Sequence, residues 1–549
     1  MSADWIMLPY TDALTDNRHR RRASLVESTW PTLEPYPKAP LASWLEGVSW
    51  RHGDRAALLD REGKGYSFRE AFTLARRIGR LLQEGGLGKG DRVALLGPNS
   101  PFYIIASLGV FRAGGALLPL SPLYKDWEMK HFLTDTGARA ALVSGDLLPR
   151  VQALKADLPE LAELYVLEEL EGRAGEVPPE PLPVEIDPEE DPSALFCTGG
   201  TTGLPKEAVH NHCDMIAALR HQMITRGANS LASWLVFTPL YLPFGLVGIG
   251  LGALSIGATQ VVMPRFDPEE AMALIQKHRI THANMAPPAL ASLAEAAKGN
   301  RYDLSSLKFV ISGTMALSKE LMERARQVLG CEVIQAVGTS ETNCLNYNPP
   351  LRVKPGSVGT PLADTQERIV DPDTGEDAGA GEVGELLVKG PQVFKGYWRN
   401  PQASAEALTP DGWFRTGDLV WADEEGYVYI VDRKKEIIKY KGYQVAPAEL
   451  EGLLAEHPAV QEVAVIPKGD PQVGEIPKAL IVLRAGAKVS PEELMAFVEE
   501  KVAPYKKVRE VEFIEAMPRS AAGKVLRREL IERERAIPLR GNPGPGRAG

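Results

Sequence analysis

Short apolar runs and amphipathic stretches alternate along the first part of the chain. Three short, mostly apolar segments predict buried strands, at Arg92–Leu96, Ala116–Leu120 and Ala140–Val143. Helix signals lie between and before them. The segment Ser67–Glu70 matches a capping box that starts a helix, and a second helical stretch ends near Arg112. Strands that alternate with helices in this way are typical of parallel sheets covered by helices.

A surface connection at Gly172–Pro192, rich in Pro and Glu, interrupts this alternation before it resumes. Further strands are predicted at Trp234–Leu240, Gln260–Met263, Lys308–Ile311 and Glu332–Gln335, and further helices at Glu269–Lys277 and Lys319–Leu329. The apolar run Gly245–Ala258 is shorter than the roughly 20 residues that a membrane-spanning helix needs, so we expect a buried core helix there. The predicted fold class is α/β, with a large N-terminal domain that contains two helix-covered sheets.

Beyond Pro355 the pattern changes to short strand-like runs broken by Gly, Asp and Pro, as in Gly381–Gly390. These runs predict a small β-rich subdomain. After Asp432 a separate α+β unit is expected, with strands near Glu462–Ile466 and Ala479–Leu483 and a helix at Pro491–Val502. The predicted domains are a large N-terminal domain at 1–434, a small C-terminal domain at 435–535 and a disordered tail at 536–549.

Composition narrows the class of protein. A chain of 549 residues is too long for one compact core, and 44% hydrophobic with 24% charged residues is typical of a soluble globular protein. The net charge of −10 argues against a nucleic-acid partner. The four cysteines show no zinc-type spacing and are expected to be reduced thiols. Without a visible secretory signal or transmembrane segment, we expect a cytoplasmic protein, and peripheral membrane contact stays open.

The most informative motif is a Gly/Thr-rich loop that follows the apolar strand-like run Ala194–Phe196. Its residues are Thr198, Gly199, Gly200, Thr201, Thr202, Gly203 and, after Leu-Pro, Lys206. Glycines let several backbone N–H groups approach one ligand, threonines add hydroxyl donors and the lysine adds positive charge, which together suit a polyphosphate. The loop is not the nucleotide-binding P-loop, because Lys206 is not followed by Ser or Thr. The alternative is a simple turn between two strands.

Four further motifs follow this loop in order along the chain. They are Gly338–Thr342 (GTSET), Gly412–Asp418 (GWFRTGD), Asp432–Tyr443 (DRKKEIIKYKGY) and Pro518–Lys524 (PRSAAGK). The ordered set resembles the adenylate-forming family of acyl-CoA synthetases, luciferases and peptide-synthetase adenylation domains. The resemblance runs from about Leu41 to about Leu530. It implies a β-barrel-like subdomain, a mobile C-terminal domain, and the use of ATP, Mg²⁺ and coenzyme A.

The resemblance also implies roles in adenylation for several residues. Thr198–Gly203 and Lys206 would hold the β- and γ-phosphates, and Glu341 with Thr198 would bind Mg²⁺. Residues implied along the rest of the nucleotide are Gly313, Val337, Gly338, Thr339 and Ser340, with Asp418 and Arg433 at the ribose. Lys524 would bridge the carboxylate and the α-phosphate as the adenylation lysine.

For the second half-reaction, the family pattern places a hinge at Asp432–Lys435, with Lys435 at the pivot. Rotation of the C-terminal domain would replace Lys524 by Lys439 and Gly442 at the same site for transfer to coenzyme A. The alternative for Glu436–Lys441 is an amphipathic strand with solvated lysines.

Several positions depart from the family pattern. Val337 stands where an aromatic residue usually stacks on adenine, and Leu242 stands where many relatives have His. Thr314-Met315-Ala316 replaces Gly-Ala-Pro, and Glu207 replaces Gly and is expected to add negative charge near the phosphates. Because Phe237–Leu251 contains no charged residue, we expect a hydrophobic acid, such as a fatty acid, in preference to an amino acid.

The predicted function is therefore an ATP-dependent ligase that activates a hydrophobic carboxylic acid as acyl-AMP and transfers it to coenzyme A. One alternative keeps the adenylation and changes the acceptor to a carrier-protein thiol or to oxygen. The other is a non-catalytic nucleotide- or acyl-binding relative. By analogy with the long-chain branch of the family, a homodimer is one alternative for the oligomeric state.

Overall fold

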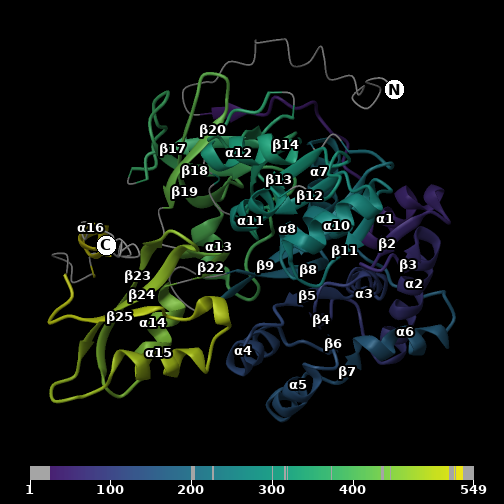
Figure 1. Cartoon of the computed structure of the whole chain (residues 1–549). Coiled ribbons are helices and arrows are strands. Elements are labelled where there is room, and N and C mark those ends of the chain that lie inside the picture. The colour runs from purple at the N-terminus through teal and green to yellow at the C-terminus, as the bar shows by residue number, and fades with distance from the viewer. Residues whose placement is uncertain are drawn as a thin grey trace, which may run out of the picture. The chain divides into compact units, whose positions relative to one another are not determined.

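The computed structural model describes residues 25–198, 205–225, 228–299, 301–314, 317, 319–350, 352–372, 374–433, 438–445, 447–518, 525 and 527–535. These residues form two compact units, and the change from the first unit to the second lies between Arg433 and Ile438. Figure 1 labels the elements, coloured from purple at the N-terminus to yellow at the C-terminus.

A six-stranded sheet forms one layer of the first unit. Across the sheet its strands are β7 (Glu163–Val166), β6 (Ala140–Val143), β4 (Arg92–Leu96), β5 (Ala116–Leu120), β8 (Pro192–Thr198) and β9 (Lys206–Asn211). All neighbours are parallel except β8 and β9, which pair antiparallel. The strands predicted at β4, β5 and β6 are confirmed at their predicted bounds, because each is a continuous buried run.

A nine-stranded sheet forms a second layer of the same unit. Its order is β16 (Thr360–Pro361), β15 (Asn346–Tyr347), β14 (Glu332–Val337), β13 (Phe309–Ser312), β12 (His282–Met285), β10 (Ser233–Val236), β11 (Thr259–Val262), β2 (Ala56–Leu59) and β3 (Gly65–Ser67). The strands from β14 to β2 are parallel, and the pairs at both edges are antiparallel.

Sequence patterning missed β12, because His282 and Asn284 interrupt its apolar character. Both are buried nonetheless. The His282 ring lies between two aromatic rings, with centroids 4.3 Å from Trp234 and 5.3 Å from Phe309. A polar residue that stacks between aromatic neighbours is therefore part of the core.

Helices of the first unit connect and cover these strands. They are α1 (Leu41–Ser49), α2 (Phe68–Glu84), α3 (Pro101–Arg112), α4 (Asp126–Thr136), α5 (Leu148–Leu154), α6 (Leu167–Gly175), α7 (His212–Thr225), α8 (Pro243–Gly245), α9 (Gly252–Ser255), α10 (Pro268–His278), α11 (Pro287–Ala297), α12 (Lys319–Leu329) and α13 (Pro401–Ala407). Short turns of 3₁₀-helix lie at Trp50–His52 and Lys155–Asp157, and a π-helix, η3 (Leu246–Leu251), joins α8 to α9. The capping box of Ser67 and Glu70 is present at the start of α2. The predicted surface connection is partly wrong, since α6 extends to Gly175.

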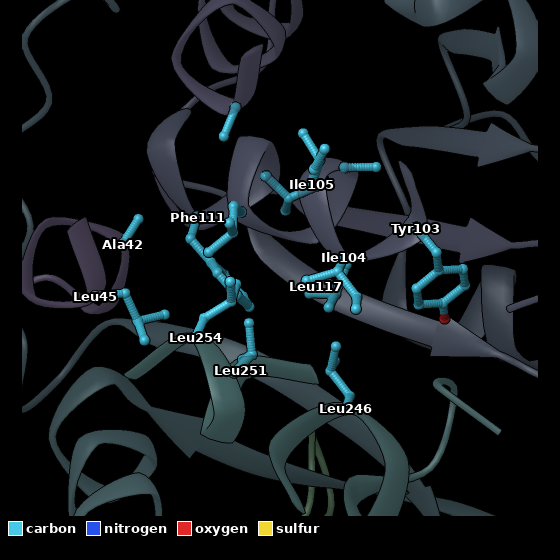
Figure 2. Close-up of a cluster of buried hydrophobic side chains, with 14 of the residues drawn as sticks. Ala42, Leu45, Tyr103, Ile104, Ile105, Phe111, Leu117, Leu246, Leu251 and Leu254 are labelled. Atoms are coloured by element: carbon cyan, nitrogen blue, oxygen red, sulfur yellow. The ribbon is translucent and has the colours of Figure 1, made fainter. Parts of the chain in front are cut away.

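The central core lies where helices from several parts of the chain pack together. Figure 2 shows Leu45 of α1, Phe111 of α3 and Leu254 of α9 pointing into one cluster with Leu117 of β5. The apolar run that continues through η3 and α9 is buried, as predicted for a core helix. A second core lies between α10, α11 and α12 and the nine-stranded sheet, where Met322 of α12 packs with residues of the strands. Both faces of that sheet are therefore covered.

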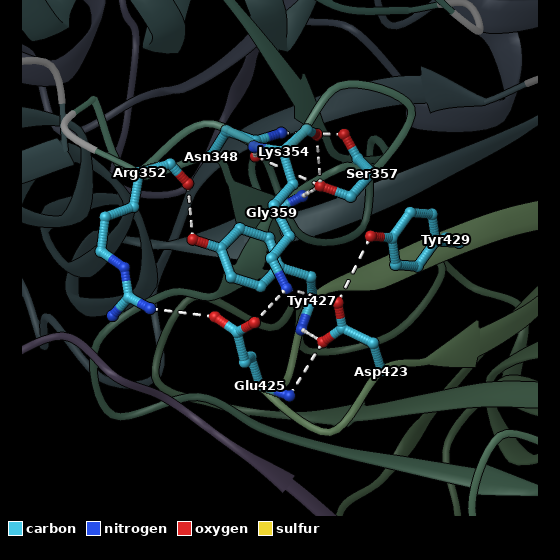
Figure 3. A network of polar contacts seen from close by, with 9 residues as sticks. All are labelled: Asn348, Arg352, Lys354, Ser357, Gly359, Asp423, Glu425, Tyr427 and Tyr429. Carbon is cyan, nitrogen blue, oxygen red and sulfur yellow. Dashed lines mark hydrogen bonds and ion pairs between the residues drawn. The ribbon is translucent and has the colours of Figure 1, made fainter. Parts of the chain in front are cut away.

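The β-rich part of the first unit is a five-stranded antiparallel sheet. Its order is β1 (Leu25–Glu27), β17 (Gln366–Val370), β18 (Gly384–Lys389), β19 (Phe414–Ala422) and β20 (Val428–Arg433). A polar network fastens the loop after β15 to the β19–β20 hairpin (Figure 3). Lys354 Nζ donates to Asp423 Oδ2 at 2.7 Å and to Glu425 Oε1 at 2.8 Å, and Arg352 pairs with Glu425 at 2.9 Å.

The second unit is the predicted small α+β fold. Its sheet contains β22 (Tyr443–Val445), β21 (Ile438–Tyr440), β24 (Gly474–Leu483) and β23 (Val460–Asp470), and β25 (Glu510–Phe513) pairs parallel with β24. Its helices are α14 (Pro447–Ala455), α15 (Pro491–Glu499), the 3₁₀ turn η4 (Pro504–Lys506) and α16 (Arg527–Arg535). The α/β fold class predicted from the sequence is confirmed. None of the helices in the described ranges has the length and apolar character to cross a membrane.

Candidate functional site

The Gly/Thr-rich loop joins two paired strands. Thr198 ends β8 and Lys206 begins β9, and the two residues are register partners in the antiparallel ladder. The ladder therefore places Thr198 and Lys206 opposite each other at the same end of the strand pair. The residues Gly199, Gly200, Thr201, Thr202 and Gly203 lie outside the described part of the chain.

A tyrosine that sequence reasoning did not identify lies beside Lys206. The segment that contains Tyr397 pairs with β9, with Tyr397 opposite Ala208 and the Val209 N–H donating to the Gly396 carbonyl at 2.9 Å. This pairing puts the Lys206 Nζ 5.0 Å from the centroid of the Tyr397 ring. A cation at that distance from an aromatic face is attracted to it.

Tyr397 also connects Lys206 to the carboxylate of Glu341. The Tyr397 hydroxyl donates a hydrogen bond to Glu341 Oε1 at 2.8 Å. Burial, and then the Glu341 carboxylate, raise the pKa of Tyr397 far above its usual range, so the phenol stays protonated and keeps donating. The structure thus brings together Lys206 and Glu341, two residues predicted to act on the same polyphosphate.

The backbone on both sides of Glu341 is held as well as its side chain. The Glu341 N–H donates to Thr339 Oγ1 at 3.2 Å, and the Glu341 carbonyl accepts from the Phe394 N–H at 2.8 Å. Only 9% of Glu341 is exposed. The carboxylate is therefore held in position by contacts within the protein.

The Glu341 carboxylate fits a magnesium ligand. Within the part of the chain that the structure describes, its second oxygen, Oε2, accepts no hydrogen bond. A single carboxylate is chemically sufficient for this role, because Mg²⁺ keeps several waters and substrate oxygens and needs only one or two protein carboxylates.

The turn before Glu341 requires a residue without a side chain at Gly338. A Cβ atom there would meet the Asn343 carbonyl oxygen at 2.2 Å, and backbone cannot move aside cheaply. The turn closes through the Asn343 N–H, which donates to the Thr339 carbonyl at 2.9 Å. Val337 ends β14 just before this turn and is half-buried, so an aliphatic face borders the predicted adenine position.

Gly313 directly follows β13 and lies against Phe244, which belongs to the uncharged segment Phe237–Leu251. A Cβ atom at Gly313 would lie 3.2 Å from the Phe244 ring and 3.3 Å from the Ala336 carbonyl. The next residue, Thr314, has a φ of 69°, a left-handed conformation that is strained for a β-branched side chain. Thr314 stands where the family pattern has Gly, so this departure introduces backbone strain next to Gly313. Met315 and Ala316 lie outside the described residues.

The two predicted ribose contacts are cross-strand partners. Asp418 in β19 lies opposite Arg433 at the end of β20. Asp418 is 4% exposed, and its N–H donates to Thr416 Oγ1 at 3.0 Å. The ladder therefore places an acidic and a basic residue at the same position of one sheet. The polar network in Figure 3 fastens the other end of this hairpin to the loop that follows the Glu341 turn.

The second unit contains Lys439 on a short hairpin. Lys439 in β21 faces Gln444 in β22, and its N–H donates to Glu475 Oε2 at 2.8 Å. The two turn residues, Lys441 and Gly442, have φ values of 49° and 86°, as a tight two-residue turn requires. Lys435 and Lys524 lie outside the described residues, so their predicted roles stay predictions.

The expectation for Glu207 is wrong. Its side chain is 1% exposed, and burial, with the nearby Asp135 carboxylate, raises the pKa of Glu207 to about 9. A carboxyl group with that pKa is neutral at pH 7 and adds no negative charge near a phosphate. Since side chains alternate along a strand, Glu207 and Lys206 lie on opposite faces of β9.

Two functional candidates were not found by sequence reasoning, Tyr397 and His210. The His210 ring, in β9, bonds to the Ser340 carbonyl directly before Glu341. No spacing rule connects either residue to Glu341, because both contacts depend on the pairing of β9 with distant segments. The strand β9 reads Lys-Glu-Ala-Val-His-Asn, so a polar residue at His210 does not stand out, and the local sequence contains no signal for it.

Comparisons with known proteins show the family and the fold of this chain. The sequence profile of the AMP-binding enzyme family matches residues 46–398, and that of the AMP-binding enzyme C-terminal domain matches residues 449–524. The chain is 34% identical to a long-chain-fatty-acid–CoA ligase of Bacillus subtilis (strain 168), over 91% of this chain and 95% of that protein. It is 35% identical to 4-coumarate–CoA ligase-like 4 of Oryza sativa subsp. japonica, over 90% and 93%.

Among solved structures, the fold matches a double mutant of o-succinylbenzoate CoA synthetase from Bacillus subtilis, bound with its product analogue OSB-NCoA. The TM-score is 0.81 at 28% identity, with 90% of this chain and 99% of that chain covered. These proteins are named for a long-chain fatty acid, 4-coumarate and o-succinylbenzoate. The nature of the acid therefore differs among proteins with the same fold.

Proposed function

This chain belongs to the family of AMP-binding enzymes, and we propose that it joins a hydrophobic carboxylic acid to coenzyme A with ATP as the activating substrate. Acid–CoA ligase activity is supported at the level of the family, because relatives that match 90% or more of the chain are CoA ligases or resemble them. The proposal adds the class of acid, the use of Mg²⁺ and the roles of individual residues.

In the first half-reaction, the acid carboxylate attacks the α-phosphate of ATP, which releases pyrophosphate and leaves acyl-AMP. Lys206 and Thr198 bind the β- and γ-phosphates, and Glu341 with Thr198 holds Mg²⁺. When bound, Mg²⁺ neutralises part of the negative charge of the phosphates. Asp418 and Arg433 bind the ribose hydroxyls, and Lys524 stabilises the charge that develops at the α-phosphate.

In the second half-reaction, the thiol of coenzyme A attacks the acyl carbon, a thioester bond forms and AMP leaves. Lys439 and Gly442 on the β21–β22 hairpin serve this step, in which the C-terminal domain has turned about the hinge at Lys435. The turn residues Lys441 and Gly442 give the hairpin a fixed local shape. A residue on such an element can be presented at one step and withdrawn at the other.

The acid is hydrophobic, and a fatty acid is the first choice. The segment from Phe237 to Leu251 contains no charged side chain, and η3 within it is buried throughout. Phe244 packs against Gly313 at the edge of the predicted nucleotide position. A binding site bordered by such a segment would accept alkyl or aryl groups and disfavour a charged amino group. The cytoplasmic location and the homodimer stay predictions from the sequence.

One observation carries the proposal. The Tyr397 ring lies 5.0 Å from the Lys206 amine, and the Tyr397 hydroxyl donates to Glu341 at 2.8 Å. Tyr397 thus links Lys206, which we propose to bind phosphate, to the Glu341 carboxylate. The second oxygen of that carboxylate accepts no hydrogen bond within the described residues. Such a pairing suits the binding of a magnesium-bound polyphosphate and has no evident use in a protein that binds only acyl groups.

A substrate panel tests the proposal. The purified protein is incubated with MgATP, coenzyme A and acids from acetate to palmitate together with 4-coumarate, and AMP and thioester are both measured. We expect equal amounts of AMP and thioester, with the highest kcat/KM for medium- or long-chain acids. AMP formation that does not change when coenzyme A is omitted would favour a different acceptor. Binding of ATP without pyrophosphate release for any acid would contradict the ligase.

A further inference from the structure

One face of β9 is directed at the Glu341 turn. Side chains two apart on a strand share a face, so Lys206, Ala208 and His210 lie in one row. Lys206 lies beside the Tyr397 ring and Ala208 is paired with Tyr397, as described above. His210 completes the row, since its Nε2 atom lies 2.7 Å from the carbonyl oxygen of Ser340.

The other ring nitrogen of His210 contacts the carboxylate of Asp214. Its Nδ1 atom lies 2.8 Å from Asp214 Oδ1, and both side chains are fully buried. The Asp214 carboxylate also accepts from the Asn211 N–H at 3.0 Å, and the Asp214 N–H donates to Asn211 Oδ1 at 2.8 Å. The Asp214 carboxylate therefore cannot rotate away from the His210 ring without losing the hydrogen bonds to Asn211 at the start of α7.

The two partners of His210 determine which ring nitrogen has the hydrogen. A carbonyl oxygen only accepts, so Nε2 must donate to Ser340. The carboxyl group of Asp214 then shares one proton with Nδ1, and the pair is satisfied on both sides. The edge of the His210 ring faces Phe196, with centroids 5.7 Å apart, which leaves the ring little freedom to tilt.

We infer that the His210–Asp214 pair is a positioning unit for Glu341, and this inference rests on the proposed function. By holding the carbonyl that precedes Glu341, the pair fixes the peptide from which the carboxylate extends. The Phe394 N–H fixes the following carbonyl, and Tyr397 fixes one carboxylate oxygen. With three constraints in place, Glu341 Oε2 would be the oxygen held ready to bind the magnesium ion of MgATP. Loss of such outer partners typically weakens metal affinity about 10- to 100-fold.

Calorimetric titration of ATP into the protein, with Mg²⁺ and separately with EDTA, tests the inference. His210→Leu removes the donor to Ser340. We expect the affinity for MgATP to fall about 10- to 100-fold, while the affinity for ATP in EDTA stays close to that of the unchanged protein. His210→Gln can still donate an N–H to the carbonyl and should recover most of the loss.

A matched control is His212→Leu. His212 is a buried histidine two positions further along, and its Nδ1 accepts from the Leu41 N–H at 3.1 Å, away from the Glu341 turn. We expect it to lower the melting temperature without a change specific to Mg²⁺. An equal effect of the two histidine variants on MgATP binding would overturn the positioning role, because it would show a general structural effect.

Glu341→Gln separates failure of this inference from failure of the proposed function. If Glu341→Gln does not weaken MgATP binding, the magnesium role in the proposed function is wrong and the inference falls with it. If Glu341→Gln weakens binding and His210→Leu does not, only the positioning unit is wrong. Should His210→Leu fail to fold, Asp214→Asn decides: a loss of about tenfold, specific to Mg²⁺, supports the inference, and unchanged binding overturns it.

Discussion

The Glu341 region and the β21–β22 hairpin, which serve consecutive half-reactions in the proposed function, are built in different ways. Glu341 is fixed by contacts between residues far apart along the chain: Tyr397 is 56 positions away, and His210 contacts Ser340 over 130 positions. Lys439, in contrast, lies on a hairpin that closes through two turn residues. The contacts that hold Glu341 span 56 to 130 positions, whereas the Lys439 strand closes with its neighbour inside eight residues, Ile438–Val445, and is held from outside by Glu475, 36 positions away.

This difference has a consequence for function. A carboxylate that binds a metal ion must be placed accurately, and contacts from several distant elements place it. A residue that serves only one of two steps benefits from an element that keeps its shape when its surroundings change. Changes in the first region should therefore impair adenylation and overall stability together. Changes in the hairpin should impair only thioester formation.

The largest effect is expected from Gly338→Ala. The added Cβ would lie 2.2 Å from the Asn343 carbonyl oxygen, so the turn that leads to Glu341 cannot keep its shape. We expect adenylation, measured by pyrophosphate release, to fall about 100-fold or more, because displacement of a catalytic group by about 1 Å costs that much. Gly452→Ala is the control, since a Cβ at Gly452 meets nothing within 4 Å. Normal activity of Gly338→Ala would show that the turn is not fixed.

The next effect concerns the stability of the first region. Burial, with Asp135, raises the pKa of Glu207 to about 9, above its ordinary value of 4.5, so the carboxyl destabilises the fold increasingly as the pH rises between these values. Glu207→Gln should raise the free energy of unfolding by about 3 kcal/mol at pH 7 and by less at pH 5. Denaturant unfolding at both pH values measures the difference. A stabilisation that does not grow with pH would contradict the neutral carboxyl.

Acid should destabilise the same region through two buried histidines. Burial lowers the pKa values of His212 and His221 to about 4, so both are neutral in the folded protein. Their stabilising contribution is present above pH 6.5 and is lost as the pH falls toward 4. Between pH 7 and pH 5, each should remove about 2 kcal/mol from the free energy of unfolding. His212→Asn should flatten this dependence, and an unchanged slope would argue against a neutral His212.

The smallest effect is expected in the hairpin. Gly442 has a φ of 86°, and alanine in this conformation costs roughly 1–2 kcal/mol. Because the strain is local, Gly442→Ala should slow thioester formation from supplied acyl-AMP and leave pyrophosphate release unchanged. Equal slowing of both half-reactions would show that the hairpin is not an independent element.

The same contrast explains what could be predicted from the sequence. Strands such as Arg92–Leu96 and the helix Lys319–Leu329 were found at their bounds, because burial gives each a continuous or periodic apolar pattern. The ordered motifs predicted roles for Glu341, Asp418 and Lys439, because each lies in a short segment of distinctive composition, and these roles stay predictions. Local information is sufficient for elements and for turns.

Contacts made by pairing of distant strands were not predictable in the same way. The link from Tyr397 to Glu341 exists only because the Tyr397 segment pairs with β9. The ionisation of Glu207 was wrong for a related reason, since its burial depends on tertiary packing that no local pattern records. The polar strand β12 was missed because aromatic neighbours from other strands cover His282.

The most direct test of the account separates the two half-reactions in two variants. Rapid-quench measurements follow acyl-AMP formation from acid and ATP, and thioester formation from supplied acyl-AMP and coenzyme A, in Glu341→Gln and Lys439→Ala. The account predicts that Glu341→Gln loses the first reaction and keeps the second, and that Lys439→Ala does the reverse. Loss of the same half-reaction in both variants would contradict it.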